Sequence, residues 1–156
     1  MDERVRFAEY RDLNDVLLLY KALRPHDPKL TADDADAAWR DVLRQPHIRV
    51  VVAEAEGCLA STCMIALNAQ LANAGRPFGV IEHVITLPQF RGRGIARATM
   101  QYALDFAWSQ NCCKVMLLSG MQRHDAHRLY ESLGFRGDTE RGFVIKPPTG
   151  NATQTP

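Results

Sequence analysis

The stretch that most constrains how this chain folds lies at residues 89–100 and reads QFRGRGIARATM. A β-rich run, FGVIEHVIT at residues 78–86, precedes it, and apolar residues at helical spacing follow it. Gly92 and Gly94 bracket Arg93 where the helix begins. Glycine lets a backbone approach a bulky anion, and a helix N-terminus presents unpaired N–H groups with a partial positive charge. The sequence therefore predicts a strand–turn–helix unit whose turn suits a phosphate or pyrophosphate.

Two other nucleotide-binding motifs do not fit this turn. The pattern GxxxxGK[ST] of nucleotide triphosphatases is absent, and Arg97 occupies the position of the third glycine in a dinucleotide fingerprint. Arg91, Arg93 and Arg97 add positive charge around the turn. On these residues alone, a turn without any ligand remains the alternative interpretation.

Length and charge narrow the class of protein. The 156 residues fit a single domain, which we place at residues 1–147, followed by a turn-rich tail at 148–156 that we expect to be disordered. Lys and Arg number 19 against 18 Asp and Glu, so the chain lacks the basic excess of a nucleic-acid or membrane-surface binder. No apolar run reaches the roughly 18 residues of a membrane span, and the charged N-terminus lacks a signal-peptide core. A cytoplasmic protein with reduced, mostly buried cysteines is expected.

The rest of the chain alternates between helical and strand-like patterns. We predict a helix capped by Asp12, a second helix capped by Thr31, and a short helix closed by Gly134. The predicted strands are residues 4–9, 48–55, 58–70, 78–86, 112–119, 135–138 and 141–147. The near-continuous apolar run at 112–119 is typical of a central strand covered on both sides. The expected fold is therefore α/β, with a mixed, mostly antiparallel sheet flanked by helices and a β-α-β unit around the glycine turn.

Two motifs in this order resemble the GNAT superfamily of acyl-CoA N-acyltransferases. Residues 89–94, QFRGRG, match the family pattern [QR]xxGx[GA], and residues 127–135, HRLYESLGF, match its tyrosine-containing second motif. The resemblance covers residues 48–146 well. The run IEHVITLPQFRGRG is also similar to the branch containing glucosamine-6-phosphate N-acetyltransferases, although His83 stands where that branch has a second acid after Glu82.

The resemblance implies acetyl-CoA as co-substrate, with no metal. Backbone amides of the glycine turn would hold the pyrophosphate, and the backbone of the preceding β-strand would line the pantetheine arm. The implied binding residues are Val84, Ile85, Thr86, Arg91, Gly92, Arg93, Gly94, Ile95, Ala96 and Ser119. As side chains, Val84 and Ile85 are interpreted as plain core residues.

The same resemblance assigns catalytic roles to two residues. Tyr130 matches the family's tyrosine acid, whose O–H would protonate the departing coenzyme A sulfur; packing in the core is its alternative role. Glu82 is the candidate base, directly or through water, because a carboxylate within an apolar strand is costly and so indicates a specific role. His83 is the rival base, and strand alternation predicts that it projects to the face opposite Glu82.

The implied activity is acetyl transfer from acetyl-CoA to a primary amine of a small molecule, directly within a ternary complex. A protein, peptide or aminoglycoside acceptor and a non-catalytic acyl-CoA-binding module are the alternatives. His124 and His127 have conceivable metal spacing, but no CxxC accompanies them, so we expect no metal. The expected partners exclude nucleic acid and membranes, and the resemblance implies a homodimer.

Overall fold

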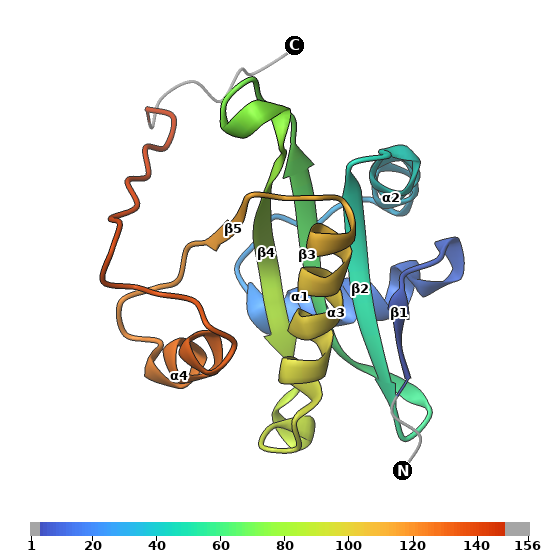
Figure 1. Ribbon diagram of the computed structural model, residues 1–156. Helices are drawn as coiled ribbons and strands as arrows, with labels where there is room; N and C mark the ends of the chain where they lie inside the picture. The colour runs from blue at the N-terminus through green and yellow to red at the C-terminus, as the bar shows by residue number, and fades with distance from the viewer. Residues whose placement is uncertain (1–3, 149–156) are drawn as a thin grey trace.

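The computed structural model describes residues 4–148 of the chain. Its centre is a five-stranded sheet in the order β1-β2-β3-β4-β5 (Figure 1). The strands are β1 (Arg4–Phe7), β2 (Ile48–Ala55), β3 (Cys58–Asn68), β4 (Phe78–Thr86) and β5 (Lys114–Leu117). Neighbouring strands are antiparallel except for β4 and β5, which run parallel. The predicted mixed, mostly antiparallel sheet is confirmed.

Helices cover both faces of this sheet. They are α1 (Leu13–Leu23), α2 (Ala32–Arg44), α3 (Ile95–Ser109) and α4 (His124–Ser132), with single 3-10 turns η1 (Tyr10–Asp12), η2 (Asn73–Gly75) and η3 (Pro88–Phe90). In Figure 1, α3 runs in front of the sheet and α1 lies behind it. The segment β4-α3-β5 is the predicted β-α-β unit, since α3 connects the two parallel strands.

Side chains that alternate along the strands contribute to two apolar layers, one on each face of the sheet. Val51 packs with Met100 and other α3 residues on one face, while its neighbours Val50 and Val52 pack with Leu19 of α1 on the other. Successive side chains of a strand point to opposite faces, so β2 contributes to both layers. The sheet is therefore packed between α3 on one face and the pair α1 and α2 on the other.

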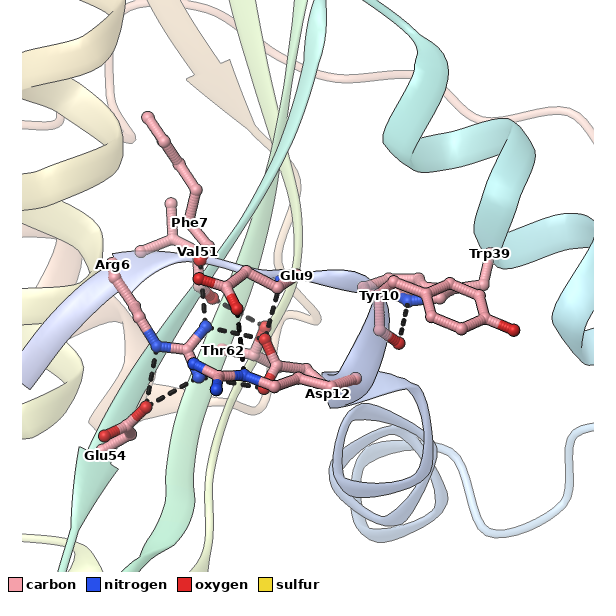
Figure 2. A network of polar contacts seen from close by, with 10 residues as sticks. Arg6, Phe7, Glu9, Tyr10, Asp12, Trp39, Val51, Glu54 and Thr62 are labelled. Atoms are coloured by element: carbon pink, nitrogen blue, oxygen red, sulfur yellow. Dashed lines mark hydrogen bonds and ion pairs between the residues drawn. The ribbon is translucent and has the colours of Figure 1, made fainter.

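An ion-pair network ties β1 to the sheet and to the start of α1 (Figure 2). The guanidinium of Arg6 donates to both carboxylate oxygens of Asp12, at 2.7 and 2.9 Å, and to Glu54 of β2 at 2.7 Å. Asp12 also accepts the backbone N–H of Glu9. Asp12 occupies the N-cap position of α1, as predicted, but its carboxylate is used by Arg6 and Glu9 and makes no cap hydrogen bond.

Local signals at two other element ends are confirmed. Thr31 accepts the backbone N–H of Asp34 at 3.1 Å and so caps α2. Gly134 has a φ of +92° and its N–H donates to the Glu131 carbonyl, which closes α4. The turn between β2 and β3 contains Gly57 with a φ of +79°, a conformation that favours glycine.

The interpretation of residues 112–119 as a central strand is wrong. β5 lies at the edge of the sheet and pairs only with β4. Its side chains alternate between exposed and half-buried, and Leu118 just beyond it is 56% exposed. An apolar run does not show whether a strand pairs on one edge or on both. Here one edge of β5 has no neighbouring strand in the described part of the chain.

The predicted final strand pair, residues 135–138 and 141–147, is also wrong. No strand is present between residues 135 and 148, the last described residue. Phe143 and Ile145 are 87% and 96% exposed, so their apolar pattern finds no partner within the described residues. Apart from residue 148, the tail expected to be disordered lies outside the described residues.

The four cysteines are free, as expected. Cys63 and Cys112 are buried, and Cys113 is half-buried. Cys58 is exposed, which departs from the expectation that the thiols are mostly buried.

Candidate acyl-CoA site

The second half of β4 has an unpaired edge on the side of the sheet where β5 lies. β5 pairs with β4 only from Phe78 to Ile81, and the two strands separate beyond that point. Figure 1 shows β5 beside the first half of β4 and α4 at the level of its second half. The backbone from Glu82 to Thr86 therefore lacks a strand partner on this edge within the described residues. Such an edge offers unpaired N–H and C=O groups to an extended ligand.

A β-bulge interrupts this half of β4. Thr62 and Met64 of β3, two residues apart, pair with Ile85 and Glu82 of β4, which are three apart. The extra residue sits at His83, whose φ is +55°. A bulge of this kind re-aims side chains and locally disrupts the ladder.

The bulge places Glu82 and His83 on the same face of the sheet. Ile81 and Val84 both pack in the layer under α3, although they are three residues apart, so the two residues between them point away from that layer. The His83 ring packs against Tyr20 of α1, with ring centroids 5.0 Å apart. The prediction that His83 and Glu82 project to opposite faces is therefore wrong, because strand alternation fails at a bulge.

Glu82 is exposed and lies within electrostatic reach of two candidate partners. Asp27 accepts the Nε–H of Arg24 at 2.7 Å and raises the pKa of that guanidinium, and the charge of Glu82 adds to the effect. Glu82 also contributes to the raised pKa of Tyr130, after burial, which is the largest cause. The carboxylate thus lies between the end of α1 and the tyrosine of α4.

The glycine turn leaves its backbone amides open. Gly92 and Gly94 have φ values of +73° and +82°, and a Cβ built on either would meet no atom within 4 Å. In the described residues, no hydrogen bond engages the N–H groups of Gly92, Gly94, Ile95 and Ala96. The Arg91 N–H is already used, since it donates to the Pro88 carbonyl at 3.2 Å. Four amides at the start of α3 are therefore available to an anion.

The arginines around the turn contact protein groups. Arg91 donates its Nε–H to the Thr86 carbonyl, and Arg97 donates to the Ser132 carbonyl and hydroxyl. Arg93 pairs with Glu56 at 2.7 Å and lies over the Phe90 ring. These contacts fix the turn to β4, to the β2–β3 hairpin and to α4, so its positive field is held in place.

The ring of Tyr130 in α4 packs in the core, whereas its hydroxyl is accessible. The residue as a whole is 7% exposed, and its ring packs edge-on against Phe135. Within residues 4–148 its O–H makes no hydrogen bond, and it is not among the buried polar atoms that lack one. Burial raises the pKa of Tyr130 and the charge of Arg123 partly opposes this, so the phenol is protonated at neutral pH.

The remaining predicted binding residues are Val84, Ile85, Thr86 and Ser119. Val84 is half-buried and Ile85 buried in opposite apolar layers, which confirms their side chains as core. The Thr86 hydroxyl is buried against the Ser61 hydroxyl at 2.8 Å, so its side chain is not open to a ligand. Ser119, just after β5, has a buried hydroxyl without a hydrogen-bond partner in the described residues. An unsatisfied buried hydroxyl is costly, so a group that paired with it would be favoured.

Sequence reasoning missed Tyr20 as a site residue. The helical spacing assigned it to the apolar stripe of α1, and its contact with His83 depends on a bulge in a distant strand. Burial raises the pKa of Tyr20 to about 12, so its ring faces His83 as a neutral phenol.

Other features of the described chain do not compete with this region. A hollow of about 250 Å³ between the end of α2 and the start of β2 contains none of the candidate residues. Between residues 4 and 148, no cluster of three or more His, Cys, Asp or Glu side chains suits a metal ion. No helix in this part of the chain is both long and apolar enough to cross a membrane.

Comparison with known proteins agrees with this geometry. A family model described as the acetyltransferase (GNAT) family matches residues 13–135. A glucosamine 6-phosphate N-acetyltransferase of Trypanosoma brucei brucei is 28% identical over 138 residues, covering 87% of this chain and 90% of the relative. A putative acetyltransferase from Agrobacterium tumefaciens is 38% identical with a TM-score of 0.87, covering 92% of this chain and 99% of the other.

The glucosamine-6-phosphate N-acetyltransferase structure from Arabidopsis thaliana has a TM-score of 0.80 at 18% identity, covering 96% of this chain and 99% of that chain. At this identity the likeness supports the fold alone. The family model and the relatives together support an acyl-CoA-dependent N-acetyltransferase. The chain therefore belongs to the acetyltransferase (GNAT) family.

Proposed function

We propose that this protein transfers the acetyl group of acetyl-CoA directly to a primary amine of a small molecule, with both substrates bound at once. The observation that carries the proposal is that β4 has an unpaired edge over its second half and leads along the chain to the free amides of the glycine turn. An extended chain that ends in a pyrophosphate fits such a path, and Ser119 lies at its β5 side with an unsatisfied hydroxyl.

The pyrophosphate would sit on the amides of Gly92, Gly94, Ile95 and Ala96, which the positive end of α3 supports. The pantetheine arm would pair with the β4 backbone from Val84 to Thr86, as a further strand would. A backbone N–H on this edge would also polarise the thioester carbonyl.

Tyr130 and Glu82 would carry the proton transfers. The amine must lose a proton before its nitrogen attacks the carbonyl carbon, and the exposed carboxylate of Glu82 would take that proton directly or through water. The carbon–sulfur bond then breaks, the Tyr130 hydroxyl would donate its proton to the departing sulfur, and the phenolate would take the second proton that the nitrogen loses on becoming an amide. The raised pKa of Tyr130 suits this role because it keeps the donor protonated.

A small acceptor is favoured by the likeness to glucosamine 6-phosphate N-acetyltransferases and by the polar groups on the α1 side of β4. There Tyr20, Glu82, His83 and Arg24 gather near the bulge. These groups suit the amine and the polar substituents of a compact metabolite.

The test is thiol release from acetyl-CoA with amino sugars, polyamines, aminoglycosides and peptides, run beside calorimetry of coenzyme A binding. We expect release with one class of small amine and amide product in equal amount. Glu82→Gln should slow turnover about a hundredfold with coenzyme A affinity unchanged. Tight binding without release for every amine would contradict the transferase and favour a binding module; release with peptides alone would contradict the small acceptor.

A further inference from the structure

His83 occupies a backbone position that glycine fills more easily. Its φ of +55° lies in the left-handed region, which residues with a Cβ rarely adopt. The side chain is nevertheless a large polar ring, packed at 5.0 Å and 34° against the Tyr20 ring. The bulge therefore holds this imidazole in one orientation on the face that also carries Glu82.

The two nitrogens of this ring have different surroundings. Nδ1 is buried and has no hydrogen-bond partner within residues 4–148. The residue as a whole is half-buried, and Nε2 is not among the buried unpartnered atoms, so Nε2 is the nitrogen that a ligand reaches. A proton on Nδ1 would be a buried N–H without an acceptor, whereas a bare Nδ1 leaves only a lone pair unused. The surroundings thus favour the tautomer with its proton on Nε2.

We propose that His83 is a substrate-binding residue rather than the base, and that its Nε2–H donates a hydrogen bond to an oxygen of the acceptor next to the reacting amine. This inference rests on the proposed N-acetyl transfer and specifies the acceptor further. Glu82 and His83 are consecutive residues on one face, so they address neighbouring atoms of a ligand. An amine with an adjacent hydroxyl, a vicinal amino alcohol, is the class that fits both groups.

The arrangement also explains why His83 does not serve as the base. A base must hold two ring protons after taking one from the amine, and the second would leave Nδ1–H buried beside Tyr20 without an acceptor. The charged groups near it include the exposed carboxylate of Glu82 and the guanidinium of Arg24, which pairs with Asp27 and also feels the charge of Glu82. Glu82 is therefore the group placed to receive the proton.

The kinetic test compares His83→Gln with His83→Phe. Glutamine places an N–H donor near the position of Nε2 but cannot act as a base, while phenylalanine keeps a ring against Tyr20 and has no donor. Both are measured on the amine with the highest kcat/KM in the panel above. We expect His83→Gln to stay within about threefold of the native acceptor KM and His83→Phe to raise it about tenfold, each with kcat and coenzyme A affinity within about twofold.

A collapse of kcat in both variants would identify His83 as the base and overturn the proposal. Equal acceptor KM values for both variants and the native protein would also overturn it, since no hydrogen bond would then be made. Thermal unfolding of both variants checks that the bulge is retained.

A second measurement needs no acceptor. A long-range ¹H–¹⁵N correlation spectrum of the native protein with coenzyme A distinguishes protonated from bare ring nitrogens, and His83→Phe identifies the signal. We expect Nε2 protonated and Nδ1 bare at pH 7. A proton on Nδ1 would refute the inference even if no amine is acetylated, whereas the expected tautomer with no turnover would count against the proposed function alone.

Discussion

Gly94→Ala tests the glycine turn, because the structure separates its effect on folding from its effect on binding. Gly94 has a φ of +82°, and an added Cβ would meet no atom within 4 Å, so no steric clash is expected. The cost comes from the left-handed backbone, about 1–2 kcal/mol, less about 0.4–1 kcal/mol from the smaller entropy of the unfolded chain. The net loss is about 1 kcal/mol in the free energy of unfolding, or about 2–4 °C in Tm for a chain of this size.

Binding should suffer more than folding does. The N–H groups of Gly94 and its neighbours Gly92, Ile95 and Ala96 have no partner in the described residues and face the proposed pyrophosphate. A Cβ at Gly94 keeps the phosphate from approaching the backbone closely. Losing one hydrogen bond to a charged group costs about 1.5–3 kcal/mol. Coenzyme A affinity should therefore fall about ten- to a hundredfold.

Gly57→Ala is the matched control. Gly57 has a φ of +79°, also has no atom within 4 Å of a built Cβ, and lies in the β2–β3 turn. Differential scanning fluorimetry should show similar losses of Tm for the two variants, while calorimetry should show weakened coenzyme A binding for Gly94→Ala alone. Unchanged coenzyme A affinity in Gly94→Ala would mean that the glycine turn does not bind the pyrophosphate, and the site would have to lie elsewhere.

Two further predictions concern catalysis and stability. Tyr130→Phe should lower kcat about a hundredfold at unchanged coenzyme A affinity, whereas Tyr102→Phe, in the same apolar layer, should leave both unchanged; equal kcat in the two variants would remove Tyr130 from the mechanism. Asp12→Ala should cost about 3 kcal/mol in urea unfolding because it leaves Arg6 buried without its main partner, while Asp138→Ala, in an exposed pair, should cost less than about 0.5 kcal/mol. Arg6 lowers the pKa of Asp12, so this contribution is present above about pH 4 and lost as the pH falls through the lower folded value; a native–variant difference that did not shrink as the pH was lowered would contradict it.

The glycine turn was predictable from the sequence because its signals are local. Gly92 and Gly94 need positive φ, Pro88 ends the strand region, and helical spacing begins at once. The caps at Thr31 and Gly134 are equally local. Each depends on a few consecutive residues, so the chain needs no knowledge of distant partners to specify them.

The bulge and the edge of the sheet were not predictable in this way. The extra residue at His83 shows only in the pairing with β3, and the alternating pattern of FGVIEHVIT conceals it. The apolar run at 112–119 gave no sign that β5 pairs on one side only, and the run at Phe143–Ile145 found no partner among the described residues. The position of Asp12 before a helix indicates a cap, and only the structure shows that Arg6, on β1, binds its carboxylate.

The single domain at residues 1–147, the homodimer and the cytoplasmic location stay predictions. The exposed edge of β5 and the exposed residue Leu118 are compatible with pairing between copies, which light scattering would test by molar mass.

The most direct measurement of the central claim follows a labelled acetyl group. The protein is incubated with [¹⁴C]acetyl-CoA, first alone and then with the amine panel. Direct transfer predicts no label on the protein in either case, and label on one amine in equal amount to the released thiol. Burial raises the pKa of Cys63 to about 12, so this thiol is a poor nucleophile for a covalent route. Label on the protein would contradict transfer within a ternary complex, and label on no amine would contradict the transferase itself.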